Sequence, residues 1–226
     1  MDILPRIPTL KAVLFDVDGT LADSDPLHLL AFQELLAEIG FNDGVPIDKE
    51  FFVRVIAGRH NPDIVRDLFP EWPPEEHTKF CDAKERKFRE LAMKLVPVDG
   101  LLRLTAWVEE KGLHRAAVTN APRENVEQML KTLGLDKFFE TVVIGCECKR
   151  PKPFPDPYQQ ALEYFGLKPE EAFVFEDSPS GVEAGVAAGM KVVGIATGNP
   201  ASSLQAAGAC MVLSDYNEPL LWKALT

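Results

Sequence analysis

The sequence predicts an α/β fold, a doubly wound parallel sheet into which a small α-helical domain is inserted. Short apolar runs rich in valine and isoleucine alternate with segments of helical periodicity, which is typical of a parallel sheet with helices on both faces. The runs are almost continuously apolar, as expected for strands buried on both faces. One long interval after the first run shows helical patterns only. These observations together indicate a Rossmann-like core interrupted by a helical insert.

Five strands are expected, each followed by a turn signal and a helical pattern. In chain order they are residues 11–15, 115–120, 141–145, 172–177 and 191–198. The helices predicted between the later strands are residues 123–134, 156–166 and 180–189.

The insert is expected to contain four helices and no strand. Its apolar residues recur at helical spacing, and prolines and glycines separate the segments. The four predicted helices are residues 26–40, 48–58, 61–69 and 75–95. The alternating pattern resumes at 96–104, so we expect a core domain of residues 1–22 and 97–226 and an inserted domain of residues 23–96.

Composition and charge limit the partners of this chain. It has 226 residues and a formal net charge of −11, which disfavours nucleic acid or an anionic membrane surface as a partner. The N-terminus lacks the pattern of a secretory signal, and no apolar run is long enough to span a membrane. We expect a cytoplasmic protein, a monomer or weak dimer. Its four cysteines are expected to be reduced thiols rather than zinc ligands: Cys81, Cys146, Cys148 and Cys210.

Polar and charged side chains follow four of the predicted strands. Ligands of open α/β sheets bind beyond the carboxyl ends of the strands, so these side chains are expected to converge. Several carboxylates in one crevice need a divalent cation, raised pKa values or both, and hard oxygen ligands suit Mg²⁺. The residues are Asp16, Asp18, Thr119, Asn120, Lys152, Glu176 and Asp177.

Two further aspartates follow the first strand. Asp23 and Asp25 precede an apolar helical segment, so we expect a helix N-cap and a solvated turn residue there. Asp16 and Asp18, two positions apart, would point in different directions on a regular strand. A turn at Gly19 is therefore expected to re-aim Asp18.

Four short motifs in the core resemble those of the haloacid dehalogenase superfamily, in the usual order. They are "DVDGT", "TN", "K-P-x-P-D" and "EDSPSG", and the helical insert lies where members with a helical cap carry theirs. The resemblance covers nearly the whole chain. The longer stretches around the motifs look most like the plant broad-range sugar-phosphate phosphatases, which are related to glycerol-3-phosphatases and β-phosphoglucomutase.

The resemblance implies a catalytic role for several core residues. Asp16 matches the nucleophile that forms an aspartyl phosphate, and Asp18 matches the general acid and base. Thr119 and Asn120 match residues that bind the phosphoryl oxygens. Lys152 matches the lysine that neutralises charge on the nucleophile and the phosphoryl group.

The resemblance also implies a Mg²⁺ site. Asp16, a backbone carbonyl near Asp18, and Asp177 match the ligands of the ion. Glu176 is assigned to the same metal site, where it is expected to act from the second coordination sphere.

Two residues of the insert are candidate substrate contacts by the same resemblance. His28 lies on the first insert helix, where a histidine of the mutase relatives helps proton transfer; packing on the helix surface is the alternative. Arg59, in a glycine-backed turn, lies where relatives contact substrate. Lys84, Arg86 and Lys87 form a basic cluster, for which a solvated helix face is expected.

The predicted function is Mg²⁺-dependent hydrolysis of sugar phosphates, with a small phosphate ester as the partner. A phosphomutase of the β-phosphoglucomutase type and a glycerol-3-phosphatase remain alternatives, because the motifs exclude neither. A dehalogenase is disfavoured because it does not need Asp18. A phosphoacceptor signalling domain is disfavoured because such domains are shorter and have no insert.

Overall fold

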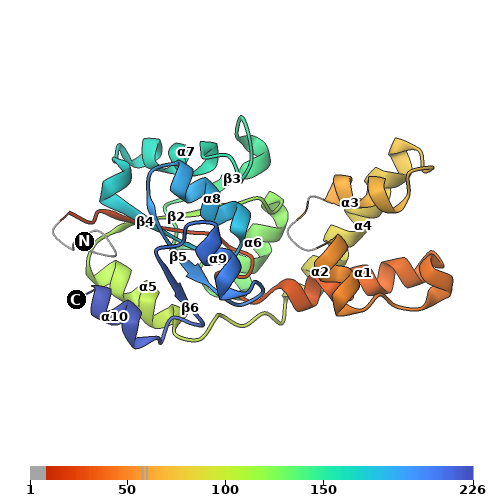
Figure 1. The fold of residues 1–226 in the computed structure, drawn as a ribbon, viewed down its shortest axis with the longest axis horizontal. Coiled ribbons are helices and arrows are strands. Elements are labelled where there is room, and N and C mark those ends of the chain that lie inside the picture. The colour runs from red at the N-terminus through yellow and green to blue at the C-terminus, as the bar shows by residue number, and fades with distance from the viewer. Residues whose placement is uncertain (1–8, 57–58, 60, 226) are drawn as a thin grey trace. The chain divides into compact units, whose positions relative to one another are not determined.

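The computed structural model describes residues 9–56, 59 and 61–225 and divides the chain into two compact units. One unit contains the chain up to Asp23 and again from Val96 onward, and the other is Ser24–Leu95 (Figure 1). The predicted insert, residues 23–96, differs from the second unit by one residue at each end. That this unit serves as a cap over a site in the core stays a prediction.

The core unit is built on one sheet of six parallel strands in the order β3-β2-β1-β4-β5-β6. The predicted fold class is confirmed, but a sixth strand at the sheet edge, which is only three residues long, was missed. The strands are β1 Ala12–Phe15, β2 His114–Thr119, β3 Thr141–Ile144, β4 Ala172–Glu176, β5 Lys191–Ile195 and β6 Met211–Leu213.

The first strand lies at the centre of the sheet. All four residues of β1 are buried, and Phe15 is level with Ala117 of β2 and Phe175 of β4. The carboxyl ends of β1, β2 and β4 therefore lie side by side. Whatever follows these three strands meets at one edge of the sheet.

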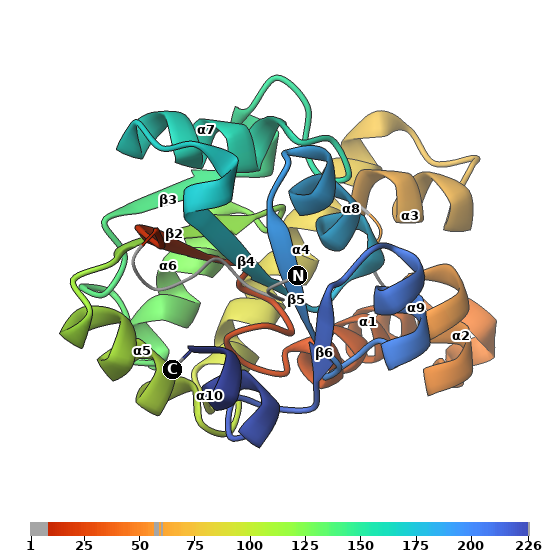
Figure 2. The same cartoon turned by 60° about the vertical axis from the view of Figure 1, so that its left-hand side comes forward.

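Helices cover both faces of the sheet. Alternate strand residues such as Leu14 and Val174 pack in one apolar cluster with α7 and α8, while α5 and α10 lie on the other face (Figures 1 and 2). The core helices are α5 Leu101–Glu110, α6 Arg123–Thr132, α7 Asp156–Phe165, α8 Pro179–Ala187, α9 Ala201–Ala206 and α10 Pro219–Leu225, with short 3₁₀ turns at Gly145–Glu147 and Pro169–Glu171.

The second unit is helical and has an apolar core of its own. Phe32, Phe52, Ile64 and Phe80 are buried together in that core. Among the residues described in this unit, no strand is present. Its elements are α1 Asp25–Glu38, η1 Phe41–Gly44, α2 Lys49–Val55, α3 Asn61–Leu68 and α4 Pro74–Ala92. The prediction of a helix over 48–58 was partly wrong, since α2 ends at Val55 and residues 57 and 58 lie outside the described part.

Two local predictions are wrong. Neither Asp23 nor Asp25 caps the first helix, because Ser24 occupies the N-cap position and Asp25 is already the first helical residue. Lys84 is not on a solvated face. It is buried, and its ammonium lies 5.6 Å from the ring centre of Phe32 and 5.5 Å from that of Phe88.

The state of the cysteines and the apolar character of the helices can be given for the described residues. The four cysteines are free in the structure. Within the described ranges, no helix combines the length and apolar character needed to cross a membrane.

Candidate active site

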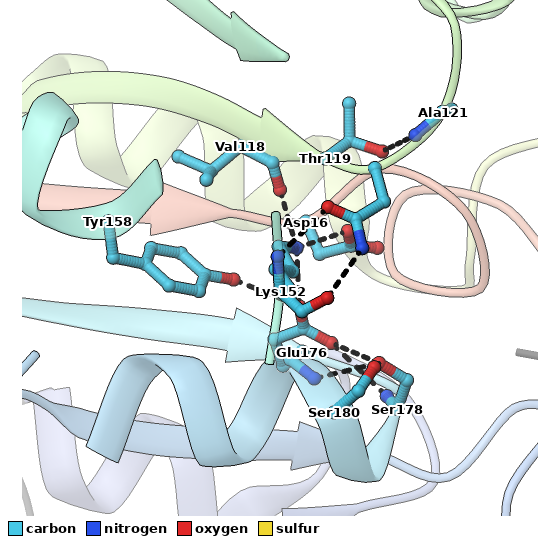
Figure 3. A network of polar contacts seen from close by, with 11 residues as sticks. Asp16, Val118, Thr119, Ala121, Lys152, Tyr158, Glu176, Ser178 and Ser180 are labelled. Carbon is cyan, nitrogen blue, oxygen red and sulfur yellow. Dashed lines mark hydrogen bonds and ion pairs between the residues drawn. The ribbon is translucent and has the colours of Figure 1, made fainter. Parts of the chain in front are cut away.

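The central strand delivers a carboxylate to the carboxyl edge of the sheet. Asp16 directly follows β1 and is only 7% exposed. Its Oδ1 lies 2.7 Å from Nζ of Lys152, a residue 136 positions later in the chain (Figure 3). The expected convergence of these two residues is thus present in the fold.

The Lys152 ammonium has three acceptors, one for each of its protons. It donates to Asp16 Oδ1 at 2.7 Å, to the carbonyl oxygen of Val118 at 2.7 Å and to Glu176 Oε1 at 2.5 Å. Asp16 directly follows β1, Val118 lies in β2, and Glu176 is the last residue of β4. The lysine therefore joins the ends of three neighbouring strands.

The Glu176 carboxylate accepts four hydrogen bonds. Besides Lys152, Tyr158 donates its hydroxyl proton to Oε1 at 2.9 Å. The backbone N–H and the hydroxyl of Ser178 both donate to Oε2 at 3.1 Å. A Cβ on Gly181 would lie 1.7 Å from Oε1, so only glycine leaves room for this carboxylate at the start of α8.

Tyr158 was missed by the sequence reasoning. It lies in "DPYQQAL" on the buried face of α7, and its side chain is fully buried. A buried tyrosine usually finds a partner for its hydroxyl, which was the one available signal. Burial raises the pKa of Tyr158 well above its ordinary value, so the phenol keeps the proton that it donates.

Asn120 holds the backbone of the lysine. Its side-chain amide donates to the carbonyl oxygen of Lys152 at 3.1 Å, and its side-chain oxygen accepts from the Lys152 N–H at 3.2 Å. The nearby Thr119 is buried, and its hydroxyl oxygen accepts from the N–H of Ala121 at 3.0 Å. That Thr119 and Asn120 also bind phosphate stays a prediction.

The pKa values of Asp16 and Lys152 are both raised, for different reasons. Burial raises the pKa of Asp16 to about 8, against the opposing effect of Lys152. Burial by itself would lower the pKa of Lys152, but the carboxylates of Asp16 and Glu176 outweigh it and raise that pKa. The lysine therefore stays charged, and the site favours a further cation that would lower the pKa of Asp16.

The donor set fits a hard divalent cation. One carboxylate oxygen from each of Asp16, Glu176 and Asp177 lies within 4.8 Å of the other two. A Cβ on Gly19 would lie 2.0 Å from Asp177 Oδ2, so the backbone of the first loop passes directly against that carboxylate. Oxygen ligands in this arrangement suit Mg²⁺.

Asp18 lies one residue before a left-handed turn. Gly19 has φ +70°, which is the turn expected to re-aim Asp18. The Gly19 N–H donates to the carbonyl of Ala22 at 2.9 Å, and Asp18 pairs with Ala22 in an isolated bridge. The half-buried Asp18 is near enough to help raise the pKa of Asp16.

The two candidates in the second unit have partners within that unit. His28 Nδ1 lies 3.0 Å from Lys84 Nζ, and its ring stacks on Phe88 with centroids 4.0 Å apart. Arg59 donates to the carbonyl of Val55 at 2.9 Å and pairs with Asp67. Contact of His28 or Arg59 with a substrate stays a prediction.

The fold and the site define a class of enzyme built on a carboxylate and lysine at the carboxyl edge of a parallel sheet. The sequence pattern of the haloacid dehalogenase-like hydrolase family matches residues 13–195. The chain belongs to this family, as its four motifs predicted.

Known relatives agree with this assignment. The phosphorylated carbohydrates phosphatase of Thermotoga maritima is 30% identical over 210 residues, which are 88% of this chain and 92% of the relative. The crystal structure of a CbbY mutant from Rhodobacter sphaeroides in complex with xylulose 1,5-bisphosphate is 25% identical. It superposes with a TM-score of 0.81 over 96% of this chain and 99% of that one. A structure from Thermotoga maritima provisionally assigned as a β-phosphoglucomutase is 30% identical, with a TM-score of 0.76 over 96% and 100% of the two chains.

Proposed function

We propose that this hydrolase is a Mg²⁺-dependent phosphatase that acts on sugar phosphates through an aspartyl phosphate. The observation that carries the proposal is the buried Asp16 carboxylate, held by Lys152 at the end of the central strand. A fixed carboxylate beside a charged lysine combines a nucleophile with a group that stabilises charge on a transferring phosphoryl group.

In the first half-reaction, an oxygen of Asp16 attacks the phosphorus of the ester. The bond from phosphorus to the sugar oxygen breaks, and protonated Asp18 gives its proton to that oxygen, so the alcohol leaves neutral. In the second half-reaction, the Asp18 carboxylate takes a proton from water as the water attacks phosphorus. The bond to Asp16 then breaks, inorganic phosphate leaves, and both aspartates return to their starting forms.

Charge is balanced by the residues around Asp16. In this proposal the positive charge of Lys152 offsets the negative charge of the phosphoryl group beside Asp16, and Thr119 and Asn120 donate to the phosphoryl oxygens. Asp16, Asp177 and the backbone carbonyl of Asp18 would hold Mg²⁺, which when bound offsets the negative charge of carboxylates and phosphate. We place Glu176 outside the direct ligands, because its two oxygens already accept four hydrogen bonds.

The substrate class is supported by the relatives. One acts on phosphorylated carbohydrates and another was crystallised with a sugar bisphosphate. In this proposal the helical unit is the cap that selects the sugar, with His28 and Arg59 as its contacts.

A phosphomutase is the second candidate. It is favoured by the similarity to a structure provisionally assigned as a β-phosphoglucomutase and by the position of His28 beside Lys84 in the helical unit. A mutase would return the phosphoryl group to the sugar at a different oxygen. Release of inorganic phosphate separates the two activities directly.

The test is phosphate release from a panel of hexose, pentose and triose phosphates and glycerol 3-phosphate, with Mg²⁺ and with excess EDTA. We expect turnover of sugar phosphates that EDTA abolishes and fresh Mg²⁺ restores. Preference for glycerol 3-phosphate would indicate a glycerol-3-phosphatase. Isomerisation of β-glucose 1-phosphate without phosphate release would establish the mutase. Turnover that is unaffected by EDTA would overturn the metal assignment.

A further inference from the structure

We propose that Tyr158 is a positioning residue that fixes the Lys152 ammonium through the carboxylate of Glu176. The inference rests on the proposed function, in which Lys152 stabilises the phosphoryl group that is transferred to Asp16. Tyr158 is outside the four motifs and touches none of the reacting atoms in that scheme.

The contacts place Tyr158 directly behind the lysine. Its hydroxyl donates to Glu176 Oε1 at 2.9 Å, and the same oxygen accepts from Lys152 at 2.5 Å. The Lys152 ammonium also lies 5.0 Å from the centre of the phenol ring. Figure 3 shows the three side chains converging from α7, β4 and the loop that carries the lysine.

The two carboxylates that hold Lys152 have different fates in the proposed reaction. Asp16 loses its carboxylate charge when one of its oxygens bonds to phosphorus and an acyl phosphate forms, so it then offers Lys152 a weaker counter-charge. Glu176 is the partner that keeps its charge throughout. Whatever fixes Glu176 therefore fixes Lys152 at the stage when the phosphoryl group must be stabilised.

The Glu176 carboxylate is held at both oxygens. Oε2 is anchored by the N–H and hydroxyl of Ser178, and Oε1 is shared by Tyr158 and Lys152. Without the phenol proton, Oε1 would have only the lysine. The carboxylate could then rotate about its Oε2 anchor, and the ammonium would follow it away from Asp16.

The substitution Tyr158→Phe removes the hydroxyl and keeps the ring beneath the ammonium. The matched control is Tyr164→Phe on the same helix, at a side chain that is 62% exposed. A second comparison is Tyr216→Phe. This hydroxyl is equally buried and donates at 2.9 Å to the Thr20 carbonyl instead of to Glu176.

We expect Tyr158→Phe to lower kcat about tenfold with KM within twofold of wild type, since one hydrogen bond to a charged group is lost. Tyr164→Phe should change neither constant. Urea unfolding of all three variants measures the cost of losing a hydroxyl. If kcat of Tyr158→Phe falls only in proportion to the folded protein lost in urea unfolding, the loss reflects stability alone and the proposal fails.

A crystal structure of Tyr158→Phe gives a readout that is independent of turnover. We expect Glu176 to rotate and the distance from Lys152 Nζ to Asp16 Oδ1 to lengthen. An active Tyr158→Phe enzyme with wild-type kcat overturns the proposal. If the wild-type protein releases no phosphate, the proposed function fails by itself; an unmoved lysine in the crystal then overturns the positioning role, and a displaced one supports it.

Discussion

Burial disfavours the ionised form of the Asp16 carboxylate. A carboxylate at the end of a fully buried strand loses its hydration, and this loss raises its pKa to about 8. Lys152 and the proposed cation stabilise the ionised form of Asp16, which burial disfavours. The residues that stabilise the ionised form of Asp16 are also those that the proposed reaction uses, which would account for their joint presence.

Substitution of Glu176 tests whether all three carboxylates of the acidic cluster bind the metal ion, or whether Glu176 holds Lys152 instead. In our account Asp16 and Asp177 bind the ion, and Glu176 holds the lysine. Glu176→Gln should lower kcat at least tenfold because Lys152 loses its permanent counter-charge. The Mg²⁺ dissociation constant, measured by calorimetry, should rise much less in Glu176→Gln than in Asp177→Asn, because only Asp177 is a direct ligand in this proposal. Equal loss of Mg²⁺ affinity in both variants would show that Glu176 is a direct ligand.

Thr20 provides a test of stability at the residue scale. Its hydroxyl is buried and has no hydrogen-bond partner in the part of the chain that the structure describes. Thr20→Val should therefore raise the free energy of unfolding by about 1 kcal/mol, because an unsatisfied polar group is removed. The matched change Thr105→Val removes a hydroxyl that donates to the Leu102 carbonyl at 3.0 Å, and should be destabilising. Denaturant unfolding measures both, and a destabilised Thr20→Val would contradict this reading.

Among the helices, α8 has a first turn with two roles, in capping the helix and in binding Glu176. Ser178 is the N-cap of α8 and accepts from the Gly181 N–H at 3.1 Å, while its hydroxyl also donates to Glu176. The N-terminus of a helix favours a negative charge, so the turn stabilises the Glu176 carboxylate as well as the helix. Ser178 therefore caps α8 and also holds the Glu176 carboxylate in place.

Ser178→Ala should therefore reduce stability and activity together. Loss of an N-cap costs about 1 kcal/mol, and loss of an anchor on Glu176 should lower kcat severalfold. Asp48→Ala is the control: it removes the cap of α2, whose Phe51 N–H donates to Asp48 at 2.7 Å. That variant should lose comparable stability in the helical unit and keep its kcat. An unchanged kcat in Ser178→Ala would contradict the supporting role of α8.

The elements also show what the sequence could and could not predict. The five longer strands and most helices follow from apolar periodicity, which burial on one or both faces enforces. The short β6 was not predicted, because a strand of three residues is too short to show a recognisable periodicity. The cap of α1 was misplaced because Asp23, Ser24 and Asp25 all have suitable side chains, and the backbone decides between them.

The same limit applies to the site. Asp16, Asp18, Lys152 and Asp177 could be predicted because each directly follows a strand or belongs to a motif. The partnership of Glu176 with Tyr158 could not, since it depends on which side of α7 meets the sheet. The burial of Lys84 was missed because its charged neighbours along the chain suggested solvent, whereas two phenylalanine rings enclose it.

At the scale of the whole molecule, the chain has two apolar cores in two compact units. Phe52 is buried in the core of the helical unit, so Phe52→Ala should destabilise that unit by about 3–5 kcal/mol. Hydrogen exchange should then rise across residues 24–95, while the strands of the sheet keep their protection. The converse change, Val174→Ala in β4, should instead raise hydrogen exchange in the strands of the sheet. Equal increases across both units in either variant would contradict two separate cores.

In the proposed mechanism Asp16 carries the phosphoryl group during turnover. The most direct measurement is to mix the Mg²⁺-loaded protein with a sugar phosphate that it hydrolyses, quench with acid and locate the phosphoryl group by peptide mass spectrometry. We expect phosphorylation of the wild-type protein at Asp16. We expect neither phosphorylation nor phosphate release in Asp16→Asn, while Asp23→Asn, at an exposed aspartate of the same segment, should behave as wild type. Substantial phosphate release by a folded Asp16→Asn variant would show that Asp16 is not the nucleophile.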